Sequence, residues 1–142
     1  MCRIGYLVGL VVLIALTACS QPEEPAGITV TTPIVVVTGA TGTQGGAVAR
    51  ELLARGYTVR ALTRNPDQQA AADLRAAGAE VVQGNFDDDE SLRAAMQGAY
   101  GVFAVTDFSE HGATRETEHG RALIYAAEDS HISHFVFSSV AS

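Results

Sequence analysis

A glycine-rich turn between an apolar run and a helical segment constrains this chain most strongly. Gly39 permits a tight turn off a strand, Gly42 lets the main chain approach a phosphate, and Gly45 lets the next helix pack closely on the sheet. The first N–H groups of that helix would face the anion, where the helix dipole favours negative charge. The alternative is an ordinary turn from strand to helix. The spacing predicts a dinucleotide phosphate loop formed by Gly39, Thr41, Gly42, Thr43, Gln44 and Gly45.

From Ile34 onward, apolar runs alternate with helical stretches, a pattern that favours a parallel sheet covered by helices. We expect strands at residues 34–38, 57–62, 80–83, 100–105 and 134–137. Helices are expected to end at Gly56, Gly78 and Gly98, and a longer one to span residues 116–129. Asn65 is expected to cap the second helix, with Pro66 at its first position.

The first 33 residues have a different character. Arg3, the apolar run 4–16 and then Thr17-Ala18-Cys19 form the pattern of an export signal over residues 1–19. The run is shorter than the roughly 20 apolar residues of a transmembrane helix. Leu16-Thr17-Ala18-Cys19 resembles a bacterial lipobox, which implies cleavage before Cys19, lipid attachment there, and a linker over residues 20–33. The alternatives are an uncleaved anchor, or a start codon assigned too early. We therefore expect a lipid anchor at the cell membrane if the leader is genuine, and a cytoplasmic protein otherwise.

Residues after the second, third and fourth strands suggest how a cofactor would be chosen. The second strand ends in Thr63-Arg64-Asn65 with no acid, so Arg64 favours NADP over NAD, unless it is a solvated surface residue. Asn85 and Phe86 follow the third strand and could flank an adenine, although Phe86 could equally belong to the core. Val105 and Thr106 follow the fourth strand and are expected near the nicotinamide ribose, because ligands collect at the carboxyl ends of parallel strands.

Charge and composition exclude other classes of protein. With 47% hydrophobic residues the chain is globular in composition. Sixteen acidic against nine basic residues give a net charge of −7, which argues against direct binding of nucleic acid. The run Asp87-Asp88-Asp89-Glu90 is interpreted as a capped first helical turn and not as a metal site. The four histidines, at positions 111, 119, 131 and 134, have no metal-binding spacing and are expected to be solvated.

Several motifs together resemble the NmrA-like family, which comprises atypical relatives of the short-chain dehydrogenases, and especially its redox-sensor branch. The motifs are residues 39–46, Thr63-Arg64-Asn65-Pro66, residues 78–84, Gly98-Ala99-Tyr100 and Val105-Thr106. The resemblance covers about residues 34 to 140. It implies an α/β fold over residues 34–142, with a Rossmann-type doubly wound parallel sheet of about five strands. It also implies that this domain binds NADP(H), with Arg64 at the 2′-phosphate. Family members continue past the equivalent of Ser139 into a substrate-binding part. The resemblance therefore implies that this sequence corresponds to the N-terminal portion of an NmrA-like domain.

Catalytic residues are not expected within this sequence. Short-chain dehydrogenases use a Tyr with a Lys four residues on, and all nine basic residues of this chain are Arg. Tyr125 has Asp129 at that spacing and is expected to pack on the sheet as a helix residue. Ser138 and Ser139 stand where such enzymes carry a catalytic Ser, but without a base they would only bond a ligand or end a strand.

Three functions follow from these observations. The first is an NADP(H)-binding domain with a sensing or regulatory role and little or no turnover, the role that the resemblance implies most often. The second is an NADPH-dependent oxidoreductase for a quinone or small carbonyl compound, whose substrate half is missing. The third is a lipid-anchored envelope protein that keeps the fold as a scaffold and binds a protein partner, which the sequence does not identify, and not a nucleotide.

Overall fold

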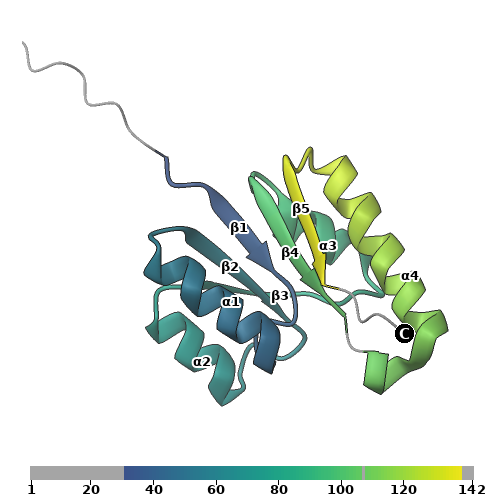
Figure 1. Cartoon of the computed structure of the whole chain (residues 1–142), viewed down its shortest axis with the longest axis horizontal. Helices are drawn as coiled ribbons and strands as arrows, with labels where there is room; N and C mark the ends of the chain where they lie inside the picture. The colour runs from purple at the N-terminus through teal and green to yellow at the C-terminus, as the bar shows by residue number, and fades with distance from the viewer. Residues whose placement is uncertain (1–30, 107, 139–142) are drawn as a thin grey trace, which may run out of the picture. The chain divides into compact units, whose positions relative to one another are not determined.

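A five-stranded parallel sheet forms the centre of the molecule, in the order β3-β2-β1-β4-β5 (Figure 1). The computed structural model describes residues 31–106 and 108–138; Cys19 and the rest of the predicted leader lie outside them, as does Ser139. The strands are β1 (Ile34–Val37), β2 (Thr58–Thr63), β3 (Glu80–Gln83), β4 (Gly101–Val105) and β5 (His134–Ser138). Each expected strand is present, with ends within one residue of those predicted. The order reverses between β1 and β4, which opens a crevice at their carboxyl ends.

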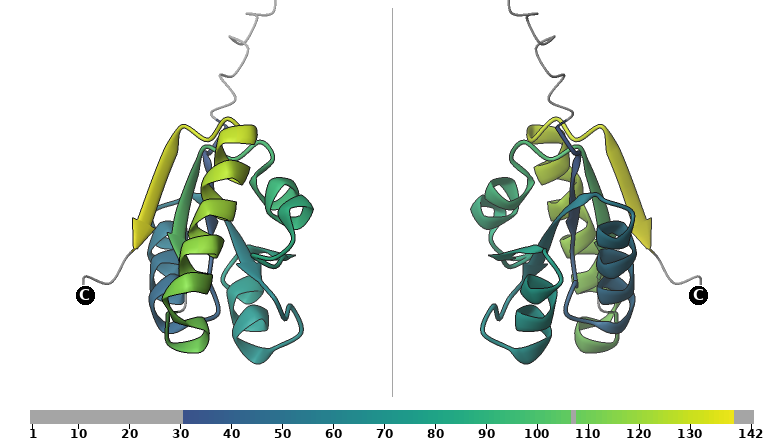
Figure 2. Two further views of the ribbon diagram at one scale, coloured as in Figure 1. Left: turned by 90° about the vertical axis from the view of Figure 1, so that its right-hand side faces the viewer. Right: turned by 90° about the vertical axis from the view of Figure 1, so that its left-hand side faces the viewer.

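The helices cover both faces of the sheet. They are α1 (Thr43–Ala54), α2 (Gln69–Ala76), α3 (Asp89–Met96) and α4 (Phe108–Asp129). Helices α1 and α2 lie on one face, and α3 and α4 lie on the other (Figure 2). Neighbouring residues of β1 enter opposite layers, because Val36 packs in the cluster with Leu92 and Leu123 while Val37 packs in the cluster with Leu74. A sheet buried on both faces explains the continuous apolar runs of the sequence. The predicted α/β fold is confirmed.

Helix α3 begins at a carboxylate cap. Oδ1 of Asp88 accepts hydrogen bonds from the backbone N–H groups of Glu90 (3.1 Å) and Ser91 (3.2 Å). Asp89 and Glu90 lie in the first turn, where negative charge complements the helix dipole. The interpretation of the acidic run as a cap is confirmed. Among residues 31–106 and 108–138, no group of three or more His, Cys, Asp or Glu side chains is placed to hold a metal ion.

Two helix starts differ from the sequence prediction. Helix α2 begins at Gln69 with Gln68 as its N-cap, so the predicted cap at Asn65 is wrong. Oδ1 of Asn65 instead accepts from the N–H of Asp67 (3.1 Å), a local turn that asparagine favours as readily as a cap. Helix α4 begins at Phe108, earlier than predicted, and breaks at Gly112, where φ is 72°. No helix in the described part of the chain has the length and apolar character to cross a membrane.

Candidate functional site

The turn after β1 is built so that side chains cannot enter it. Gly39 has φ +57°, a conformation that favours glycine, and its oxygen accepts from the N–H of Gly42 at 2.9 Å. A Cβ added at Gly45 would lie 2.4 Å from that same oxygen, which is closer than real Cβ contacts. One at Gly46 would lie 2.9 Å from the oxygen of Ala40. The start of α1 therefore presses directly against the loop backbone, as expected for a phosphate loop.

The first turn of α1 faces open space with no side-chain cap. Its N-cap is Gly42, which has no side chain to accept from the following N–H groups. The first N–H groups of a helix have no partner within the helix. Helix α3 meets this need with Asp88, whereas α1 leaves the N–H groups available to an external anion. The structure thus combines a close backbone approach with an anion-attracting helix terminus.

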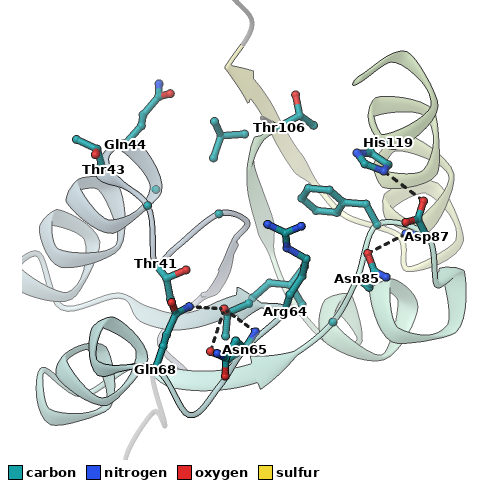
Figure 3. Close-up of a pocket in the computed structure, with 18 residues that line it drawn as sticks. Thr41, Thr43, Gln44, Arg64, Asn65, Gln68, Asn85, Asp87, Thr106 and His119 are labelled. Atoms are coloured by element: carbon teal, nitrogen blue, oxygen red, sulfur yellow. Dashed lines mark hydrogen bonds and ion pairs between the residues drawn. The ribbon is translucent and has the colours of Figure 1, made fainter. Parts of the chain in front are cut away.

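This helix terminus opens onto a cavity of about 500 Å³ at the carboxyl ends of the strands (Figure 3). The cavity extends from the glycine loop past the ends of β2, β3 and β4 to the wall formed by α4. Every predicted cofactor-binding residue lines it: Gly39, Thr41, Gly42, Thr43, Gln44, Gly45, Arg64, Asn85, Phe86, Val105 and Thr106. Predicted residues up to 67 positions apart in sequence therefore meet around a single space.

Arg64 projects into this cavity from the end of β2 (Figure 3). The segment that carries it is fixed by Thr63, which is 6% exposed. The Thr63 hydroxyl accepts from Nε2 of Gln68 at 3.1 Å and from the N–H of Asn65 at 3.2 Å. These hydrogen bonds join residues on both sides of Arg64 and hold its backbone in place. The Arg64 side chain therefore extends into the cavity from a fixed point of the backbone.

The opposite wall consists of Phe86 and two residues that the prediction did not include, Asp87 and His119. Phe86 packs against the core, as one of the two alternatives for it held, and it also lines the cavity. His119 was expected to be solvated, and that prediction is wrong, because the residue is only 4% exposed. The helical period could have revealed this, since His119 precedes the buried Leu123 by one turn of α4.

Near the ends of β4 and β5, polar side chains join distant segments. The Thr106 hydroxyl donates to Oε1 of Glu116 at 3.0 Å. Nε2 of Gln44, in the first turn of α1, donates to the Ser138 hydroxyl at 2.6 Å. Ser138 is the last residue of β5, which is one of the two roles expected for it, and its hydroxyl bonds the phosphate-loop helix. Tyr125 is 59% exposed, so the expectation that it packs on the sheet is wrong, and it lies outside the cavity lining.

Seven lining residues were absent from the predicted site. Leu62 lies two residues before Arg64 and Gly84 lies directly before Asn85, both at strand ends, where the rule that ligands collect at carboxyl ends would have found them. Gln68 lines the cavity as the N-cap of α2, which starts later than predicted. The full set is Leu62, Thr63, Asn65, Gln68, Gly84, Asp87 and His119.

Comparisons with known proteins agree with this geometry. The chain is 42% identical over 112 residues to the NmrA-like family domain-containing oxidoreductase FrzB of Cladobotryum sp., covering 75% of this chain and 33% of FrzB. Among solved structures, NmrA, a negative transcriptional regulator in complex with NADP, matches with TM-score 0.70 and 26% identity over 78% of this chain and 34% of NmrA. Citrobacter sp. triphenylmethane reductase complexed with NADP(H) matches with TM-score 0.64 and 27% identity, over 76% and 37% of the two chains.

The chain thus spans about a third of the length of the relatives it matches. The family model that describes the NmrA-like family matches residues 31–142, which include every strand and helix of the described structure. The resemblance seen in the sequence is confirmed, and this chain belongs to the NmrA-like family.

Proposed function

We propose that this chain binds NADP(H) in the cavity and serves as a sensing or regulatory domain with little or no turnover. One observation carries the proposal: a single cavity unites an uncapped glycine loop with Arg64 at the tip of β2. The loop has the form that a pyrophosphate requires, and Arg64 stands where NADP-binding folds accommodate the 2′-phosphate. Relatives of similar fold bind this cofactor, since the matched structures of NmrA and triphenylmethane reductase contain NADP or NADP(H).

Different residues of the cavity would contact different parts of the cofactor. Thr43, Gln44 and the loop glycines would hold the pyrophosphate through backbone N–H groups, with no side chain in between. A charge-assisted bond from Arg64 to the 2′-phosphate contributes about 1.5 to 3 kcal/mol, or about 10- to 100-fold in affinity. Asn85 and Phe86 would flank the adenine.

Val105 and Thr106 would contact the nicotinamide ribose at the other end of the cavity. When bound, NADPH supplies a hydride, and the residues that line the cavity bind and orient it. The Thr106 hydroxyl is held by Glu116, so its oxygen keeps lone-pair capacity toward the ribose. This division predicts cofactor binding without identifying any group that would donate a proton to a substrate.

The regulatory role is supported by the chemistry of the side chains. The 142 residues contain no Lys, so the Tyr-Lys pair of short-chain dehydrogenases cannot form from them. Tyr125, whose spacing to Asp129 resembles that pair, is 59% exposed and outside the cavity. NmrA, which has a higher TM-score than triphenylmethane reductase, is described as a negative transcriptional regulator.

The second candidate is an NADPH-dependent oxidoreductase, and the identity to FrzB favours it. FrzB is named an oxidoreductase and is 42% identical to this chain, which spans 33% of its length. Under this candidate, the residues that bind a quinone or small carbonyl substrate would come from outside these 142 residues. The two candidates share the cofactor site and differ in whether bound NADPH is consumed.

Titration of the full chain with NADPH, followed by nicotinamide fluorescence, tests the shared claim. We expect a Kd in the micromolar range, about 1 to 100 μM. The same preparation is then supplied with quinones and small aldehydes while NADPH absorbance is recorded. Binding without consumption supports the regulatory role, and consumption supports the oxidoreductase. A folded chain that binds no NADPH would contradict both.

A separate proposal concerns the N-terminal segment outside the described residues. As an alternative to cofactor sensing, because NADPH is not expected outside the cytoplasmic membrane, we propose that Cys19 carries a lipid and attaches the domain to the cell membrane, on the evidence of Leu16-Thr17-Ala18-Cys19 alone. Labelling of bacterial cells with radioactive palmitate tests it, with Cys2→Ala as the matched control. We expect label on the unchanged chain and on Cys2→Ala, and none on Cys19→Ala. Equal labelling of the two variants, or an unlabelled chain, would contradict the proposal.

A further inference from the structure

The cavity wall opposite the glycine loop is held by a buried histidine. His119, from α4, is 4% exposed, and its ring centroid lies 5.2 Å from that of Phe86 with the planes at 54°. Figure 3 shows His119 beside Asp87, with both residues at the rim of the cavity. Tilted aromatic pairs at this separation are mutually stabilising. The histidine therefore limits where the Phe86 ring can lie.

Asp87 is held from the same helix at both carboxylate oxygens. Oδ1 lies 3.3 Å from Nε2 of His119, and Oδ2 lies 2.9 Å from Nη2 of Arg115. A carboxylate oxygen accepts, so Nε2 of His119 is the donor. Arg115 and His119 are one helical turn apart and meet the carboxylate side by side. The Arg115 pair is half exposed and contributes little stability by itself, but together the two contacts fix the orientation of Asp87.

The segment around Phe86 is also fixed from its other side. The N–H of Asn85 donates to the Ser91 hydroxyl at 3.1 Å, and Oδ1 of Asn85 accepts from the N–H of Asp87 at 3.3 Å. Phe86 thus stands between two residues that are each tied to a helix, Asn85 to α3 and Asp87 to α4. Contacts from both helices therefore hold the residues on either side of Phe86, which itself lines the cavity.

We propose that His119 and Arg115 are positioning residues that hold Phe86 as a preorganised stacking surface for the adenine of the dinucleotide. This inference rests on the proposed function and adds residues that no motif of the sequence assigned to the site. Preorganisation raises affinity because the ligand does not have to order the wall when it binds. His119 acts through Phe86 and Asp87 and is not required to touch the cofactor.

The test measures 2′,5′-ADP binding to the full chain by calorimetry, because this ligand contains the adenosine half alone. His119→Leu removes the donor and the ring, and we expect affinity to fall about tenfold for both 2′,5′-ADP and NADPH. His119→Gln retains a donor toward Asp87 and should recover part of the loss. Circular dichroism and thermal unfolding establish that each variant is folded at the temperature of the titration.

A double-mutant cycle with Phe86→Ala separates positioning from a general structural effect. If His119 acts through Phe86, His119→Leu should change affinity by less than about twofold in the Phe86→Ala background. Additive losses in the cycle would overturn the inference, and so would unchanged 2′,5′-ADP affinity in His119→Leu. Should His119→Leu not fold, Arg115→Gln carries the test from an exposed position, with Arg121→Gln on the same helix as the control of equal charge.

For that pair we expect weaker 2′,5′-ADP binding in Arg115→Gln and no change in Arg121→Gln. An equal loss of 2′,5′-ADP affinity in both variants would show that the loss comes from the removed positive charge, and it would overturn the inference. An unchanged chain that binds neither NADPH nor 2′,5′-ADP would overturn the proposed function and this inference together. Binding by the unchanged chain that the variants leave intact would overturn this inference alone.

Discussion

The hydroxyl of Thr38 makes two hydrogen bonds to the backbone of Val105, 67 residues away in the sequence. It donates to the Val105 carbonyl at 2.9 Å and accepts from the Val105 N–H at 2.8 Å. Thr38 is fully buried and directly precedes the glycine loop, while Val105 ends β4 and lines the cavity. The Thr38–Val105 contact links the carboxyl ends of β1 and β4, the two strands between which the sheet order reverses. It therefore holds together the two strand ends that border the crevice.

Replacing Thr38 by Val should therefore lower stability and cofactor affinity together. The variant keeps the shape of the side chain but leaves two backbone groups of Val105 without their partner, at a cost of about 2 to 3 kcal/mol. Thr38→Ser keeps the hydroxyl and loses one methyl group, at a cost of about 1 kcal/mol. Chemical denaturation of both variants measures the difference. A Val variant that is no less stable than the Ser variant would show that these hydrogen bonds contribute nothing.

Gly45→Ala tests the close approach of α1 to the loop. The added Cβ would lie 2.4 Å from the Gly39 oxygen, so the loop must move away from the position that suits a pyrophosphate. We expect NADPH affinity to fall by at least about tenfold, in a chain that remains largely helical by circular dichroism. Gly120→Ala is the matched control, since its Cβ would meet Phe137 at an ordinary 3.6 Å. Normal affinity in a folded Gly45→Ala variant would mean that the loop does not hold the phosphates.

Arg60 is expected to contribute to stability without contributing to binding. It lies in β2 with a side chain that is 13% exposed, and its Nη1 donates to the carbonyls of Ala95 (2.7 Å) and Gln97 (3.0 Å) at the end of α3. Positive charge at a helix C-terminus is favourable, and hydrogen bonds from charged groups are among the stronger ones. Arg60→Leu should cost about 2 to 3 kcal/mol in the free energy of unfolding, measured by denaturant titration.

The control for this prediction is Arg55→Ala. Arg55 pairs with Glu51 at 2.7 Å, but its side chain is 68% exposed, so its removal should cost less than about 1 kcal/mol. NADPH affinity should stay unchanged in both variants. Equal destabilisation by the two substitutions would refute the structural role assigned to Arg60.

The fold can be predicted well from this sequence because the apolar runs and the glycine spacing indicate the same strand, loop and helix boundaries. The apolar runs around Val36 and Val102 predict buried parallel strands, and the spacing of Gly39, Gly42 and Gly45 identifies the loop between β1 and α1. Knowing that ligands collect at the carboxyl ends of such strands then brings the residues that follow each strand to one place. No contact between distant residues had to be known to reach that result.

The helical period could have indicated that His119 is buried, but no local pattern identifies the distant residue that it contacts. His119 is a polar residue whose partner, Asp87, lies 32 positions earlier, and only the packing of α4 against α3 brings the two together. Asn65 can either cap a helix or close a turn, and the contact of Gln68 with Thr63 accompanies the second arrangement. Tyr125 has the apolar character of a packed helix residue, but it lies on a face of α4 that is exposed to solvent.

The most direct test of the central claim compares NADPH and NADH binding to the unchanged chain and to Arg64→Ala, with Arg55→Ala as a control outside the cavity. The two cofactors differ only in the 2′-phosphate, which Arg64 is placed to contact. We predict that NADPH binds more tightly than NADH, and that Arg64→Ala weakens NADPH by about tenfold or more while leaving NADH and the control unchanged. A folded Arg64→Ala variant that keeps full preference for NADPH would contradict the account, as would an unchanged chain that binds neither cofactor.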